Sequence, residues 1–94
     1  MRFEIWKYPF TTADTFCLSI PKGGKILSLD IQYGPTIWAL VDTEQPGEQR
    51  TFVTYGTGCP IISPESKTYI GTYQEMGGAL VWHVFELLER KNNE

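Results

Sequence analysis

Apolar and polar residues alternate one by one from position 27 to position 33, and this pattern predicts a β-strand over Lys25–Tyr33 with one buried face. The Gly34-Pro35 pair ends that strand. The following segment, Thr36–Asp42, holds the apolar run Ile37–Val41, and a strand without polar alternation is typically covered on both faces. The two segments are expected to pair as a hairpin, so the chain is expected to fold around a β-sheet.

The composition extends this expectation of strands to the rest of the chain. Ten threonines and thirteen aromatic residues against three alanines favour strand over helix. Further strands are expected over 2–8, 15–20, 50–55, 68–74 and 79–88, although 79–88 also fits a helical stripe. Seven short strands predict one all-β or β-dominated α+β domain over residues 1–94, a compact antiparallel sandwich or barrel. A short C-terminal helix is the alternative for 79–88, and 89–94 is expected to be a frayed tail.

The charge and the counts of cysteine and histidine exclude several classes of function. With a net charge of -3 and eight Lys and Arg residues, the chain is not expected to bind nucleic acid in bulk. One histidine and two cysteines are too few for a four-ligand zinc site, and we expect neither a metal nor a cofactor. We find no signal peptide and no run of about 20 apolar residues, so we expect a cytoplasmic protein with free thiols and no membrane partner. Cys17, between two apolar residues, is expected to be buried.

The glycine-rich segment 55–58 (Tyr-Gly-Thr-Gly) is the most suggestive place for a ligand. Its glycines let backbone amides approach an anion, its threonine adds a hydroxyl group, and Arg50 precedes it on the same expected strand. The segment is neither a Walker loop, since no Gly-Lys-Ser/Thr follows, nor a dinucleotide fingerprint, since no helix follows. The alternative is a plain glycine turn that ends a strand. The candidate ligand-binding residues are Lys25, Arg50, Tyr55, Gly56, Thr57, Gly58 and His83.

His83, the only histidine, belongs to no recognisable catalytic set. On a strand it lies on the face opposite Trp82, and a partly buried, hydrogen-bonded histidine is the alternative to a ligand contact. A nucleophile pair of Cys59 and His83 has no support in the spacing, since Pro60 leaves no helix N-terminus to activate the thiol. We therefore expect no enzymatic activity and no catalytic residues.

The many tryptophans and tyrosines indicate contacts beyond a minimal core. Three Trp and five Tyr residues occur in the chain, and both types are enriched at interfaces and in pockets that stack bases. Trp38, Trp82 and Tyr73 are candidate interface residues, with a position in the core as the alternative for both tryptophans. Tyr55, Tyr69 and Tyr73 lie near glycines and are candidates for the wall of a pocket.

Five sequence blocks resemble one family over nearly the whole chain, from residue 3 to residue 87. The blocks are IPKGGKILS (20–28), WALVD (38–42), GTG (56–58), YIGT (69–72) and VWHVFE (81–86). The chain resembles a family of short, largely uncharacterised proteins of phages and of bacteria that carry phage-like DNA, in which histidine often stands at the position of Cys59. No block is a known catalytic motif, so the resemblance implies a small phage-type accessory protein.

Several unrelated phage proteins of this size sequester nucleotide second messengers of bacterial anti-phage defence, and by analogy this role is our leading hypothesis. The ligand would be a cyclic dinucleotide or a cyclic ADP-ribose derivative. A chain of 94 residues is small for enclosing such a molecule, so we expect a homo-oligomer with pockets between subunits. The alternative is a protein–protein interaction module that inhibits or adapts a host or phage protein in the bacterial cytoplasm.

Overall fold

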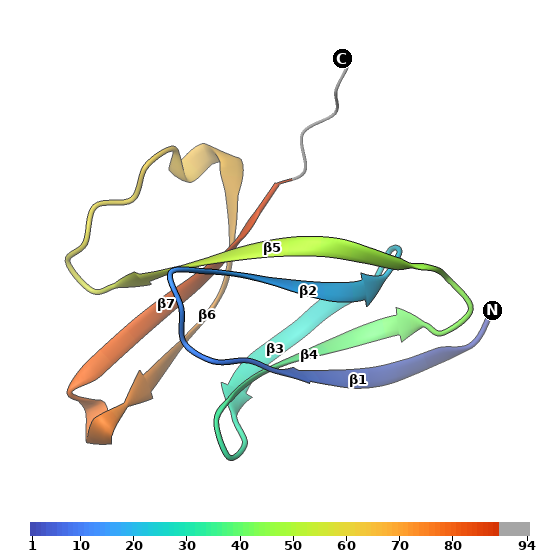
Figure 1. Cartoon of the computed structure of the whole chain (residues 1–94), viewed down its shortest axis with the longest axis horizontal. Coiled ribbons are helices and arrows are strands. Elements are labelled where there is room, and N and C mark those ends of the chain that lie inside the picture. Colours follow the sequence, from blue (N-terminus) through green and yellow to red (C-terminus); the bar gives the residue numbers. More distant parts are fainter. Residues whose placement is uncertain (89–94) are drawn as a thin grey trace.

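Residues 1–88 are described by the structure, a computed structural model, and they form two antiparallel sheets around a common core (Figure 1). The first sheet has the strand order β1-β4-β3 and the second the order β2-β5-β7-β6. The strands are β1 (Phe3–Pro9), β2 (Thr15–Pro21), β3 (Lys25–Ile31), β4 (Pro35–Asp42), β5 (Gly47–Gly56), β6 (Lys67–Glu75) and β7 (Leu80–Leu87). Two single-turn 3-10 helices, η1 (Pro64–Ser66) and η2 (Met76–Gly78), flank β6, and no helix in residues 1–88 is long and apolar enough to cross a membrane. The prediction of an all-β antiparallel fold is confirmed, in its sandwich form.

The hairpin predicted from the alternating and the apolar segments is present as β3 and β4. These strands pair antiparallel, from Lys25 opposite Leu40 to Ile31 opposite Pro35. The ambiguous segment near the C-terminus is strand β7, which pairs with both β5 and β6. The turn η2, with positive φ at its two glycines, connects β6 to β7, and the pairing satisfies the backbone groups of β7 without a helix. The expected tail, 89–94, lies outside the described residues.

The core lies between the two sheets and is built from side chains that alternate along the strands. The buried hydrophobic residues are Ile20, Ile37, Ala39, Val41, Phe52, Tyr73 and Val84. Burial of each larger aliphatic or phenyl side chain among them contributes about 1.5–3 kcal/mol. Three of the seven come from β4, because β4 is the central strand of its sheet.

The predicted buried face of β3 is wrong, because the strand contains a bulge. The register with β4 shifts between Ile26 and Ser28. The alternation of inward and outward side chains before the shift therefore does not continue in the same phase after it. Ile26 and Leu29 pack against the core, whereas Leu27, expected inside, is 45% exposed. Tyr33, also expected inside, lies beyond the end of β3 in a turn with a positive φ, and its side chain is fully exposed.

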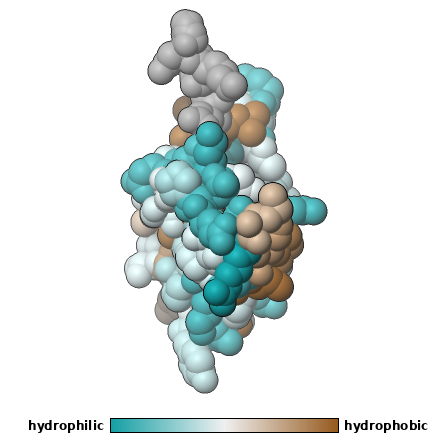
Figure 2. All heavy atoms as spheres, turned by 90° about the vertical axis from the view of Figure 1, so that its right-hand side faces the viewer, coloured by the Kyte–Doolittle hydropathy of each residue, from teal (hydrophilic) through white to brown (hydrophobic). Residues whose placement is uncertain are grey.

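Two further expectations about burial are wrong. β4 was expected to be covered on both faces, but the residues that alternate with its buried ones, Trp38 and Leu40, are partly exposed. Both residues lie on the outer face of the sheet. Figure 2 views the end of the molecule where β1 begins and β4 ends, and apolar atoms gather on one side of the molecule in that view. Cys17 is exposed rather than buried, because its neighbours on β2 take the positions that face the core. Cys17 and Cys59 are both free thiols.

Candidate functional site

Two of the predicted ligand contacts, Lys25 and Arg50, line one groove between β3 and β6. Residues 23–27 and residues 68–70 line the groove, and Arg50 and Glu86 complete the lining. Its volume is about 440 Å³, within the range of roughly 300–1,000 Å³ that small-molecule sites occupy. We call this cavity the Arg50 groove. It joins residues from four strands and from the turn between β2 and β3.

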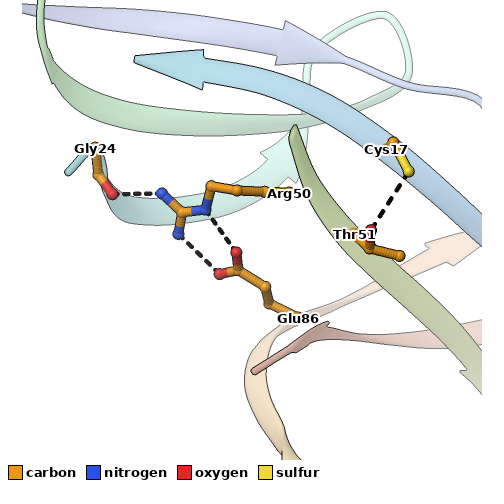
Figure 3. A network of polar contacts seen from close by, with 5 residues as sticks. All are labelled: Cys17, Gly24, Arg50, Thr51 and Glu86. Atoms are coloured by element: carbon orange, nitrogen blue, oxygen red, sulfur yellow. Dashed lines mark hydrogen bonds and ion pairs between the residues drawn. The ribbon is translucent and has the colours of Figure 1, made fainter. Parts of the chain in front are cut away.

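Arg50 is held in the groove by a network of hydrogen bonds (Figure 3). Its Nε and Nη2 atoms donate to the two carboxylate oxygens of Glu86 at 2.5 and 2.8 Å, and its Nη1 atom donates to the carbonyl oxygen of Gly24 at 2.5 Å. The Arg50 and Glu86 side chains are only 19% and 15% exposed. The hydrogen bonds with Glu86 raise the pKa of Arg50, so the guanidinium keeps its charge. Arg50 therefore ties β5 to β7 and to the β2–β3 turn.

The Arg50 groove combines positive charge with an aromatic ring. Arg50 uses three of its five N–H donors in the bonds described above, which leaves two for a ligand. Lys25 is exposed, and Tyr69 is 55% exposed, although one side of its ring packs edge to face on Phe85. Lys25, Arg50 and Glu86 together give the groove a formal charge of +1. Such a set can hold an anionic group near Lys25 and stack a planar ring against Tyr69.

The glycine-rich turn lies at a second cavity, of about 370 Å³, which shares no lining residue with the Arg50 groove. Tyr55, Gly56, Cys59 and Trp82 are among its lining residues. A Cβ atom on Gly56 would lie 3.5 Å from the Trp82 ring and 3.6 Å from the Cys59 sulfur, so glycine permits this close packing. Gly58 has a φ of 89°, which glycine adopts without strain. The structure therefore does not bring this turn together with Arg50.

His83 lies apart from both cavities, and hydroxyl groups bind both of its ring nitrogens. The Thr57 hydroxyl lies 2.7 Å from Nε2 and the Thr72 hydroxyl lies 2.9 Å from Nδ1. The hydroxyl of Tyr69 in turn hydrogen-bonds Thr72. Within residues 1–88 no carboxylate hydrogen-bonds the imidazole, and no group of three His, Cys, Asp or Glu residues is placed to hold a metal ion. The arrangement thus lacks the acid that would orient His83 as a general base.

The three candidate interface residues occupy different environments. Trp38 lies on the outer face of β4, with the Lys7 ammonium 5.9 Å from its ring centroid. Trp82 packs against the core, and its Nε1 atom donates to Glu75 at 3.0 Å. Tyr73 is 4% exposed and belongs to the core, so its side chain is not available to a partner.

Glu86 is the charged residue of the groove that was not among the predicted ligand contacts. Its position follows from the pairing of β5 with β7, in which Glu86 lies opposite Phe52, two residues after Arg50. That pairing joins segments 36 positions apart in the sequence. The available signal was an acidic residue within the apolar strand 81–87, since a carboxylate in such a strand needs a partner.

One protein-family model matches the whole chain. The family is described as a domain of unknown function (DUF7352), and the match covers residues 1–94. No curated protein and no solved structure matches the chain.

Proposed function

The chain belongs to the DUF7352 family, and we propose that it is a non-catalytic protein that binds a nucleotide-derived ligand in the Arg50 groove. The ligand class is a cyclic dinucleotide or a cyclic ADP-ribose derivative, as used for signalling in bacterial anti-phage defence. A protein that holds such a signal keeps it from its receptor. Under this proposal the chain is a phage-type accessory protein that acts in the cytoplasm of the bacterial host.

The observation that carries the proposal is the convergence of Lys25, Arg50 and Tyr69 on one groove. A nucleotide offers an anionic phosphate and a planar base, and these need a cation and an aromatic surface. The net charge of the chain is -3, whereas the charged residues of the groove sum to +1. The positive charge is therefore local, which suits a small anionic ligand better than a long nucleic acid.

The proposal of binding without reaction rests on the residue types in the groove. Its lining contains no histidine and no cysteine. Arg50, its partly buried cation, is already paired with Glu86. Sequestration requires only affinity, so these residues are sufficient for it.

A thermal-shift screen against cyclic dinucleotides, cyclic ADP-ribose isomers and ordinary nucleotides tests the proposal. A ligand that binds only the folded protein stabilises it by about 2.7 kcal/mol at a hundred times its dissociation constant. We expect a large shift with one cyclic nucleotide, which is then recovered intact after heat denaturation. Recovery of a converted product would contradict a non-catalytic role.

Variants of Tyr69 test whether the shift arises in the Arg50 groove. Tyr69→Ala removes the ring and should reduce affinity, because stacking on an aromatic ring contributes about 1–3 kcal/mol per base. Tyr33→Ala is the matched control, since Tyr33 is fully exposed and does not line the groove. Equal affinity of the two variants would place the ligand elsewhere.

A second candidate function, binding of a host or phage protein, is favoured by an aromatic cluster outside the core. Tyr55 and Phe85 make an edge-to-face contact with ring centroids 5.9 Å apart, and Tyr69 and Phe85 make another at 5.4 Å. Tyrosine and phenylalanine are enriched in the interfaces of protein complexes. This cluster is a surface on which a partner protein would find rigid aromatic contacts.

Capture with two matched variants tests this second function. Phe85→Thr should lose a partner that the original chain captures from infected host cells, because Phe85 is at the centre of the cluster. Ile62→Thr should keep that partner, because Ile62 is 77% exposed in the loop before η1. If both variants capture the same proteins as the original chain, the cluster is not a docking surface.

A further inference from the structure

The outer face of the β1-β4-β3 sheet is an apolar surface that no part of residues 1–88 buries. We call it the outer apolar face, and it consists of Phe3, Ile5, Trp38 and Leu40. The exposed fractions are 59% for Phe3, 63% for Ile5 and 36% for Leu40. Single exposed apolar side chains are ordinary, but neighbouring ones on adjacent strands mark an interaction surface.

The two faces of β4 differ sharply. Ile37, Ala39 and Val41 are fully buried in the core, whereas Leu40 between them is exposed beside Ile5 of β1. An uninterrupted apolar strand is typical of a sheet covered on both sides. The sequence of β4 therefore suits a sheet whose outer face is covered by something beyond the described part of the chain.

We propose that a second copy of this chain covers the outer apolar face, so that two β1-β4-β3 sheets stack in a two-fold symmetric dimer. The charges at the ends of the face favour a copy as the occupant. In the β1–β4 pairing, Lys7 lies opposite Trp38 at one end and Asp42 lies opposite Phe3 at the other, with Ile5 and Leu40 between them. Antiparallel stacking about an axis through the middle brings Lys7 of one copy to Asp42 of the partner subunit. The symmetry forms this contact twice.

Two further charges lie on the edge strand β3, Lys25 opposite Leu40 and Asp30 opposite Thr36. A lysine at an edge can extend its ammonium group past the rim into water while its alkyl chain covers apolar surface. A second copy carries the same Lys7, Asp42 and aliphatic centre. Its face is therefore complementary to that of the first copy. The dimer does not require the ligand proposed for the Arg50 groove, but Lys25 borders both the groove and the outer apolar face.

The size of the face sets the expected strength of the dimer. Three strands of seven or eight residues span about 25 Å by 14 Å, on the order of 350 Å² in projection. Specific interfaces bury about 800 Å² per partner, so this face has less than half of the usual area. We therefore expect a weak dimer, which forms at high protein concentration and dissociates on dilution.

Sedimentation equilibrium over a wide range of protein concentration tests the dimer. The original chain should change from monomer to dimer, and Ile5→Glu should raise the dissociation constant by about tenfold or more, because it places a charge at the centre of the face. Ile62→Glu adds the same charge at an exposed loop and should leave the dissociation constant unchanged. Circular dichroism of Ile5→Glu establishes that the loss of the dimer is not a loss of fold.

A charge exchange tests the proposed arrangement of the two copies. Lys7→Glu alone and Asp42→Lys alone should each weaken dimerisation, because like charges then meet at both ends of the interface. An equal mixture of the two variants should restore it, because in the mixed dimer both end contacts join opposite charges. A chain that stays monomeric at all concentrations, or an Ile5→Glu variant that dimerises as well as the original, would overturn the proposal and leave the face to a different protein. A mixture that dimerises no better than the single variants would overturn the antiparallel arrangement.

Discussion

Arg50 on β5 and Glu86 on β7 form a two-point ion pair, with Nε 2.5 Å from Oε2 and Nη2 2.8 Å from Oε1. The same guanidinium donates to the carbonyl oxygen of Gly24, so the Arg50 side chain connects β5 and β7 to the β2–β3 turn. The pair thereby fixes the shape of the Arg50 groove, and a change at Arg50 alters stability as well as ligand contact.

Arg50→Ala should lower the free energy of unfolding by about 1–3 kcal/mol, because it leaves the Glu86 carboxylate largely buried without its partner. The matched control is Arg2→Ala. Its pair with Glu4 is exposed, at 72% and 36%, and should contribute at most about 1 kcal/mol. Urea unfolding of both variants measures the difference. Equal stability of the two variants would show that the Arg50–Glu86 pair stabilises the fold no more than an exposed pair does.

Two buried tyrosine hydroxyls should respond differently to removal. The Tyr8 hydroxyl is buried and has no hydrogen-bond partner within residues 1–88, whereas the Tyr73 hydroxyl lies 2.7 Å from the Thr12 hydroxyl. Tyr8→Phe should leave the free energy of unfolding unchanged or raise it, and Tyr73→Phe should lower it by about 1 kcal/mol. Urea unfolding measures both changes. The reverse order of the two variants would contradict the hydrogen bond between Tyr73 and Thr12.

The stability of the fold should decrease at alkaline pH. Burial raises the pKa of both Tyr8 and Tyr73 above the usual tyrosine value of 10.0. The folded state therefore favours the neutral phenols, and this contribution is complete below about pH 10 and is lost as the pH rises through the folded-state pKa values. Melting temperatures measured across this range should fall less steeply for the double variant Tyr8→Phe/Tyr73→Phe. Tyr33→Phe, at a fully exposed position, should retain the original profile.

Gly24→Ala should destabilise the fold, because a Cβ atom there would lie 2.5 Å from Cγ2 of Ile20 and 3.1 Å from the carbonyl oxygen of Pro21. Ile20 is fully buried, so it cannot move away freely, and overpacking of this kind costs about 1–3 kcal/mol. Gly34→Ala is the control, since its Cβ would meet nothing within 4 Å. Thermal unfolding should separate the two variants, and an unchanged melting temperature for Gly24→Ala would contradict the packing of this turn.

The sequence was sufficient for the strands and the hairpin because their signals are local. Alternation and the Gly34-Pro35 break identify β3 and β4, whereas the segment 79–88, which is β7, also fits a helical stripe. The bulge between Ile26 and Ser28 has no comparable signal, since it depends on the pairing of β3 with β4. It exposes Leu27, a residue that strict alternation would bury.

The candidate site was less predictable because its residues are joined by long-range pairing. The sequence indicates both Lys25 and Arg50, but their meeting in one groove depends on how the two sheets pack. It also indicates the glycine-rich segment 55–58, yet Tyr55 and Gly56 of that segment line a different cavity. Glu86 was missed because only the register of β5 with β7 brings it to Arg50.

Titration calorimetry tests whether the Arg50 groove binds the cyclic nucleotide found by thermal shift, with the original chain compared with Lys25→Ala and Lys22→Ala. Both lysines are exposed and near the β2–β3 turn, but only Lys25 lines the Arg50 groove. We expect Lys25→Ala to weaken binding by about tenfold, the loss of one cation at a phosphate, and Lys22→Ala to bind like the original chain. Equal binding by all three proteins, or no binding by the original chain to any nucleotide of the screen, would contradict a nucleotide site in the Arg50 groove.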